Sequence, residues 1–361
     1  MKSNYRYIVK AFMAMAVIAG TTSCDDFLDR EPMSSISPET YYSTAAQLEA
    51  NLNDEYPNVL PSFGQWTYGI FGEDKGTDNQ IEVNANDRYT QDRWKVPHSE
   101  SDNWKFERIY RINFFLSEAL PKFGEDMSGS QNTISGSVAT IKHYIGEMYF
   151  LRAYEYFKKL QLFGDFPIIN QPLADEMEAL REASKRFPRN EVARFIISDL
   201  DKAYAYMSDV DMATTRINKD VAMLVKSRVA LFEATWLQNF KGTAFVPGGE
   251  GWPGASLHNN YQYPSGNIDN EVKYFLEQAV EASKLVADKY KGSLTENTGV
   301  LQQSADDPSN PYFDMFAQED LSDVKEVLLW RQYARGLSTH NINAAAGRGN
   351  YRIGLTRGFV Q

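Results

Sequence analysis

The stretch LRAYEYFKKLQLFGDFPII, residues 151–169, decides the fold of this chain. Together with the residues before it, it repeats apolar side chains at helical spacing on two stripes, one with Phe150, Ala153, Phe157 and Leu160, the other with Tyr149, Tyr156 and Phe163. Two apolar stripes predict a helix over 141–163 that packs on two sides. Gly164 and Pro167 are expected to cap this helix and turn the chain.

Helical periodicity continues on both sides of this stretch. Thr44 and Gln47 form a capping box before an apolar stripe, and residues 102–120 carry another stripe. Asn190 and Asn218 are expected to cap two further helices, and one more begins near Asp269. We expect a mainly α fold, a degenerate array of helical pairs like tetratricopeptide repeats, that supports a loop-rich region with little β structure. The sequence VKEVLLW from Val324 predicts one short strand.

The amino terminus has the pattern of an export signal. Three basic residues precede the apolar stretch 11–20 and the small residues 21–23, and the only cysteine, Cys24, follows. The apolar stretch is too short to span a bilayer as a helix. Cys24 could be an intermolecular disulfide partner, a buried thiol or a lipidated residue; its position favours lipidation, with 1–23 as the signal peptide. Asp25 and Asp26 behind it resemble an acidic surface-export tag.

Composition and charge narrow the possible partners. The chain has 361 residues, 43% hydrophobic, with 37 basic against 48 acidic side chains, a net charge of −11. This composition indicates a globular protein and disfavours nucleic acid as a partner. The four histidines are far apart and no H-E-x-x-H occurs, so we expect no metal site. Residues 249–254 fit G-x-G-x-x-G but lack the strand and helix that a dinucleotide needs, so no cofactor is expected.

Two long loops contain aromatic residues among Gly, Asn, Asp and Pro, at 61–100 and 240–268. A sugar presents an apolar C–H face that stacks on an aromatic ring, while amide, carboxylate and guanidinium groups bond its hydroxyls. The first loop supplies this chemistry, although core packing remains the alternative for any single tryptophan. The candidate ligand-binding residues are Trp66, Tyr68, Asp78, Asn79, Arg88 and Trp94, preferred over Trp104 and Trp236 on helix stripes.

The motif at 151–169 resembles that of the SusD/RagB-type outer-membrane lipoproteins, R-A-x-x-Y-F-x-L-x-x-x-F/Y-G-D-V/I-P, with Phe166 in place of the usual branched aliphatic residue. Further similar stretches follow the family order at 24–29, 109–119 and 189–236. The resemblance implies a helical bundle without catalysis. It also implies a lipid-anchored protein on the cell surface that captures oligosaccharide and delivers it to a TonB-dependent, SusC-like transporter in the outer membrane.

The chain differs from the family in length. Members usually continue to a segment similar to T-D-I-x-x-x-R-L-A-E, which is absent here, so residues 24–361 are expected to form a SusD-like domain without its C-terminal portion. Two other functions stay open. One is a helical-repeat module that binds peptide or protein, and the other is an exported helical glycoside hydrolase, for which no catalytic pair of carboxylates can be singled out.

Overall fold

The computed structural model describes residues 41–61, 74, 76–82, 91, 103–124, 126–208, 212–301, 304, 306–333, 339 and 353–360. Its contacts divide the chain into two units, Met1–Tyr42 and Ser43–Gln361. Of the first unit only Tyr41 and Tyr42 are described, with their rings edge to face at 4.8 Å between centroids. The predicted signal peptide and Cys24 lie outside the described residues. All that follows concerns the second unit.

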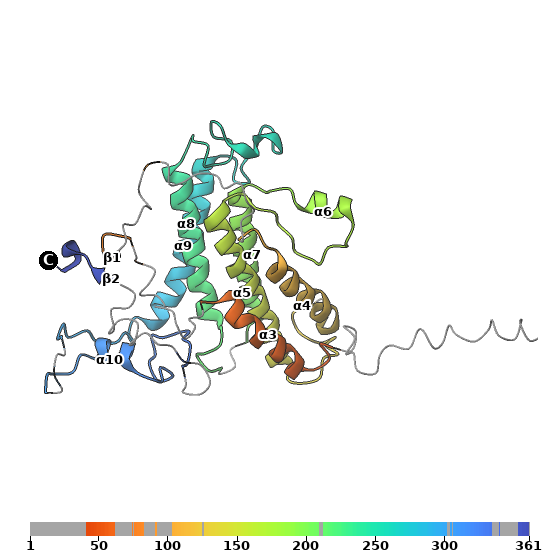
Figure 1. The fold of residues 1–361 in the computed structure, drawn as a ribbon. Helices are drawn as coiled ribbons and strands as arrows, with labels where there is room; N and C mark the ends of the chain where they lie inside the picture. The colour runs from red at the N-terminus through yellow and green to blue at the C-terminus, as the bar shows by residue number, and fades with distance from the viewer. Residues whose placement is uncertain are drawn as a thin grey trace, which may run out of the picture. The chain divides into compact units, whose positions relative to one another are not determined.

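The second unit is mainly α-helical, which confirms the expected fold class (Figure 1). Its longer helices are α3 (Ala45–Val59), α4 (Glu107–Phe123), α5 (Val138–Phe163), α7 (Arg189–Tyr206), α8 (Lys219–Asn239) and α9 (Ile268–Tyr290). Shorter elements are α6 (Met177–Ala183), the 3-10 helix η2 (Pro253–Ser256), α10 (Pro311–Ala317) and α12 (Arg357–Val360). Strands β1 (Gln80–Glu82) and β2 (Ile353–Leu355) pair antiparallel, with Ile81 opposite Gly354.

Helix α5 is the centre of the packing. It contacts α3 and α4 as well as α7, and α7 in turn packs on α8, which packs on α9 (Figure 1). Both apolar stripes of α5 are buried: Phe150 from one is 1% exposed and Tyr156 from the other is 0% exposed. Burying a large side chain of this kind stabilises the fold by about 1.5–3 kcal/mol. The prediction of a helix packed on two sides is therefore confirmed.

Buried arginine–carboxylate pairs join the helices in addition to the apolar contacts. Arg152 of α5 donates from Nε and Nη2 to the two carboxylate oxygens of Asp199 on α7, at 2.6 and 2.8 Å. Its Nη1 also donates to Asn113 Oδ1 of α4 at 2.9 Å. Arg194 of α7 holds Glu271 of α9 in the same way, at 2.7 and 2.8 Å. Each pair fixes one helix against the next, because a misplaced helix would leave a buried charge unpaired.

Most of the predicted helix ends are confirmed. The capping box of Thr44 and Gln47 is present, and the Asn218 side chain accepts from the Val221 N–H. The prediction that Asn190 caps a helix is wrong, because α7 begins one residue earlier, at Arg189. The Asn190 amide is buried and donates instead to Glu271 Oε1 at 3.0 Å.

The predicted strand from Val324 is also wrong. The backbone there bonds locally, with Val324 N–H donating to Leu321 O at 3.1 Å and Val327 N–H to Val324 O at 3.0 Å. These turn bonds leave no ladder for a neighbouring strand. The segment ends against another loop, where Trp330 N–H donates to the Thr214 carbonyl at 3.1 Å.

Candidate functional site

Two of the predicted ligand-binding residues, Asp78 and Asn79, lie in an exposed turn before β1. The Asn79 carbonyl accepts from Thr356 N–H at 2.9 Å, and its amide donates to Asp74 Oδ2 at 3.4 Å. Trp66, Tyr68, Arg88 and Trp94 lie outside the described residues. The proposed role of all six in ligand binding therefore stays a prediction.

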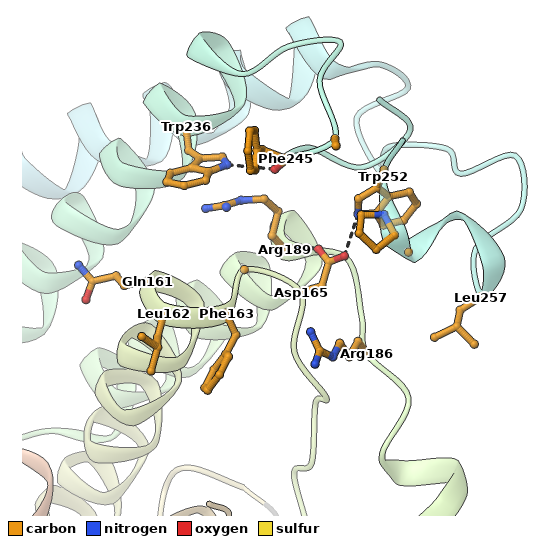
Figure 2. Close-up of a pocket in the computed structure, with 14 residues that line it drawn as sticks. Gln161, Leu162, Phe163, Asp165, Arg186, Arg189, Trp236, Phe245, Trp252 and Leu257 are labelled. Atoms are coloured by element: carbon orange, nitrogen blue, oxygen red, sulfur yellow. Dashed lines mark hydrogen bonds between the residues drawn. The ribbon is translucent and has the colours of Figure 1, made fainter. Parts of the chain in front are cut away.

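The described part of the chain contains a pocket of about 620 Å³ where α5 ends and α7 begins (Figure 2). This volume is within the range of about 300–1,000 Å³ that small-ligand sites occupy. The pocket brings together four segments that are distant in the sequence. They contribute Gln161, Leu162, Phe163, Gly164 and Asp165; Arg186 and Arg189; Trp236; and Ala244, Phe245, Trp252, Pro253, Gly254 and Leu257.

Asp165 connects three of these segments. Gly164 ends α5 with a φ of 68°, a conformation that favours glycine, and so turns the chain to place Asp165 beside α7. Asp165 Oδ1 accepts the Arg189 backbone N–H at 2.9 Å, while Oδ2 accepts the Trp252 indole N–H at 2.7 Å (Figure 2). Because the N-cap residue of α7, Pro188, makes no side-chain bond, Asp165 takes the capping role from another segment.

The charge of Asp165 is compensated within the protein. Burial raises the pKa of its carboxyl, while the bonds from Trp252 and Arg189 and the positive charge of Arg186 act in the opposite direction. The carboxylate also lies at the N-terminal end of α7, where the helix dipole favours a negative charge. Asp165 therefore has a structural role, because each of its carboxylate oxygens accepts a hydrogen bond from another segment of the protein.

Arg189 is the second buried charge at the pocket. Its Nη2 lies 2.9 Å from Glu233 Oε2, and its guanidinium carbon lies 4.0 Å from the Trp236 ring centroid. Glu233 is 0% exposed; burial raises the pKa of its carboxyl, and the charge and hydrogen bonds of Arg189 oppose this rise. The pair fixes α7 against α8 and covers one face of the Trp236 indole, so the charge of Arg189 is paired within the protein.

The Phe245 ring is the most accessible aromatic surface of the pocket. The Trp236 indole N–H donates to the Phe245 carbonyl at 3.0 Å, which fixes the backbone while the Phe245 side chain stays 61% exposed (Figure 2). Leu162 and Leu257 are also more than half exposed at the same pocket. An exposed ring held on a fixed backbone can stack on the apolar face of a ligand at low entropic cost.

The sequence favoured the first aromatic loop, whereas the described pocket lies against the second. Neither Asp78 nor Asn79 lines it. Trp236 belongs to the site although its place on a helix stripe argued for core packing. The signal that points to this pocket is the second loop itself, where Phe245 and Trp252 stand among glycines and prolines.

No cluster of three or more His, Cys, Asp or Glu side chains suited to a metal ion occurs in the described part of the chain. None of the helices described above has both the length and the apolar character needed to cross a bilayer.

Comparison with known proteins identifies the family. Residues 26–231 match a SusD-like family described as starch-binding and associating with the outer membrane. The SusD-like proteins P2 and P25 of Formosa agariphila are each 25% identical, over 253 and 233 residues. These alignments cover 67% and 59% of this chain but 46% and 41% of the relatives. The chain thus spans less than half the length of these relatives.

Solved structures of similar proteins have the same family name. A SusD-like protein from Bacteroides fragilis is 22% identical, with a TM-score of 0.41 over 59% of this chain and 39% of its own. A laminarin-binding SusD-like protein is 19% identical, with a TM-score of 0.39 over 55% of this chain and 42% of its own. The family match itself covers more than half of the chain, including α3 to most of α8. The chain therefore belongs to the SusD-like family.

Proposed function

We propose that this chain is a cell-surface lipoprotein that binds glycan and delivers it to a TonB-dependent transporter of the outer membrane. The observation that carries the proposal is the family match over residues 26–231, whose description combines starch binding with the outer membrane. A laminarin-binding member among the solved structures supports a carbohydrate ligand. Because the chain spans less than half of its curated relatives, the proposal concerns the part of the function that these residues carry.

The pocket of Figure 2 gives this function a physical basis. Sugar binding needs an accessible ring for the C–H face and polar groups for the hydroxyls. Phe245 supplies the ring, and Gln161 and Arg186 are exposed polar side chains at the same pocket. The predicted loop residues Trp66, Tyr68, Arg88 and Trp94, with Asp78 and Asn79, are the second candidate surface.

Binding is tested by affinity electrophoresis of the purified chain through gels that contain plant, host or microbial glycans. We expect retardation on at least one glycan, and a weaker retardation for Phe245→Ala if the pocket binds it. Phe316→Ala is the matched control, because Phe316 is 71% exposed on α10 and lies outside the pocket. No retardation on any glycan would overturn the proposal. Loss of binding on Trp66→Ala and Trp94→Ala alone would place the site in the first loop.

The proposal also includes binding without cleavage. Incubation of a retarding polysaccharide with the chain is expected to release no new reducing ends. Release that depends on the chain would instead support the glycoside hydrolase that the sequence left open.

The proposed lipid anchor and the proposed transporter partner are tested separately. Metabolic labelling with a fatty acid is expected to mark the wild-type chain but not Cys24→Ala. Co-purification with a TonB-dependent transporter from outer-membrane extracts is expected for the wild type. An unlabelled wild-type chain would contradict the lipid anchor, and a transporter that never co-purifies would contradict delivery through it.

A further inference from the structure

Arg186 is the charged side chain of the pocket that the protein leaves available. Its guanidinium carbon lies 4.5 Å above the Trp104 ring centroid, and the indole itself packs edge to face on Phe163 of the pocket wall at 4.8 Å. Within the described part of the chain, no oxygen accepts a hydrogen bond from this guanidinium and no carboxylate forms a salt bridge with it, although its positive charge helps to lower the pKa of the Asp165 carboxyl. An arginine stacked on an indole is held in orientation while the N–H groups at its edge stay free.

The other charges at the pocket are already in use. Asp165 accepts one bond on each oxygen, and Arg189 is bound by Glu233 through both Nε and Nη2. Arg186 is therefore the group whose charge an incoming ligand would meet. This local positive charge stands out in a chain whose net charge is −11.

Rings and apolar side chains line the same pocket as this cation. Phe245 and Leu257 are exposed at the pocket, and Trp252 forms part of its wall (Figure 2). A ligand that fits must therefore have an apolar face and an acceptor group that prefers a guanidinium. A planar carboxylate or a sulfate receives two parallel N–H bonds from such a fork, which makes it the preferred partner over a neutral hydroxyl.

We propose that this pocket is a subsite for a sugar with an anionic substituent, a uronic acid carboxylate or a sulfate ester, that Arg186 recognises while Phe245 stacks on the ring. The inference rests on the proposed glycan-binding function and specifies its ligand class. Asp165 lies in the same pocket, but its charge is compensated by the bonds from Trp252 and the Arg189 N–H, by the positive charges of Arg189 and Arg186, and by the helix end.

The test is isothermal titration calorimetry of the purified chain with matched oligosaccharide pairs. Oligogalacturonate is compared with its methyl ester, and a sulfated heparin fragment with its desulfated form; malto- and laminari-oligosaccharides serve as neutral probes. The carboxylate and sulfate arms separate the two sources of negative charge. We expect at least one anionic probe to bind about tenfold more tightly than its masked counterpart, the effect of a charge-assisted hydrogen bond in a partly exposed site.

Two arginine variants test which side chain causes the preference for the charged probe. Arg186→Gln is expected to abolish the preference for the charged probe while binding of the masked probe changes less than about twofold. Arg181→Gln is the control, because Arg181 is an exposed arginine on α6 that does not line the pocket. Circular dichroism confirms that each variant is folded.

The outcomes distinguish this inference from the function on which it rests. Binding of glycan without preference for the charged form, or a preference that survives in Arg186→Gln, would overturn the inference and leave glycan binding intact. Absence of binding to every probe and every glycan gel would overturn both.

Discussion

Replacement of Asp165 with alanine is predicted to destabilise the protein, because one carboxylate supports two elements. The substitution removes the bond that caps α7 at the Arg189 N–H and leaves the indole N–H of Trp252, a side chain only 5% exposed, without a partner. A lost cap costs about 1 kcal/mol. An unsatisfied buried donor costs about 1–3 kcal/mol.

The sum is about 2–4 kcal/mol, reduced by relief of the buried charge. Burial raises the pKa of the Asp165 carboxyl, so its ionised form is itself disfavoured and its removal recovers part of the loss. We therefore expect the alanine variant to lose about 2 kcal/mol of unfolding free energy, and Asp165→Asn to lose about half as much, because the amide keeps one acceptor oxygen.

The assay is urea denaturation at pH 7 followed by circular dichroism, with hydrogen exchange of the first amides of α7 as a local readout. Asp175→Ala is the control, an exposed aspartate expected to change stability by less than about 0.5 kcal/mol. If Asp165→Ala were as stable as this control, or if the Arg189 amide exchanged no faster than in the wild type, Asp165 would not have the structural role described above.

Three further predictions concern the helical frame. Burial disfavours ionisation of Glu271, but hydrogen bonds, led by the one from Arg194, lower the pKa of its carboxyl below 4.5. The ionised carboxylate therefore contributes its full share of the folding stability above pH 4.5, and this stability is lost as the pH falls through the lowered pKa. Glu271→Gln should flatten the stability profile in that window, and an unchanged profile would contradict the shift. Arg152→Ala removes both guanidinium hydrogen bonds of the buried Asp199 carboxylate and leaves it only the ion pair with Lys202, 3.6 Å from Asp199 Oδ1. It should cost about 3 kcal/mol in urea denaturation; a loss below about 1 kcal/mol would contradict the pairing. Gly164→Ala places a side chain at a φ of 68° and should cost about 1 kcal/mol, whereas a stabilised variant would show that this turn is not strained.

The helices could be predicted from the sequence because their causes are local. The capping box of Thr44 and the cap of Asn218 depend on residues three positions away, and the stripes of α5 depend on a fixed period. The cap assigned to Asn190 failed because partners outside the helix engage its side chain: Oδ1 accepts from the Tyr261 hydroxyl at 3.0 Å, and Nδ2 donates to Glu271. The prediction of a strand from Val324 is wrong because the backbone N–H groups there form hydrogen bonds within local turns.

The pocket could not be predicted in this way because its parts meet only after the helices pack. Asp165 and Trp252 are joined across 87 positions of the sequence, and Arg189 meets Glu233 across 44. The sequence motif around Gly164 identified the scaffold, but nothing local showed that the same aspartate also holds the wall of a cavity. Aromatic content alone pointed to both long loops and did not choose between them.

The attachment of Phe245 has a consequence for how such a protein can change over evolutionary time. Its backbone is secured by Trp236, whereas its ring faces outward and contributes little to the interior. A substitution at this position can therefore change the surface that a ligand would meet, while the two indoles keep the loop attached to an unaltered helical frame.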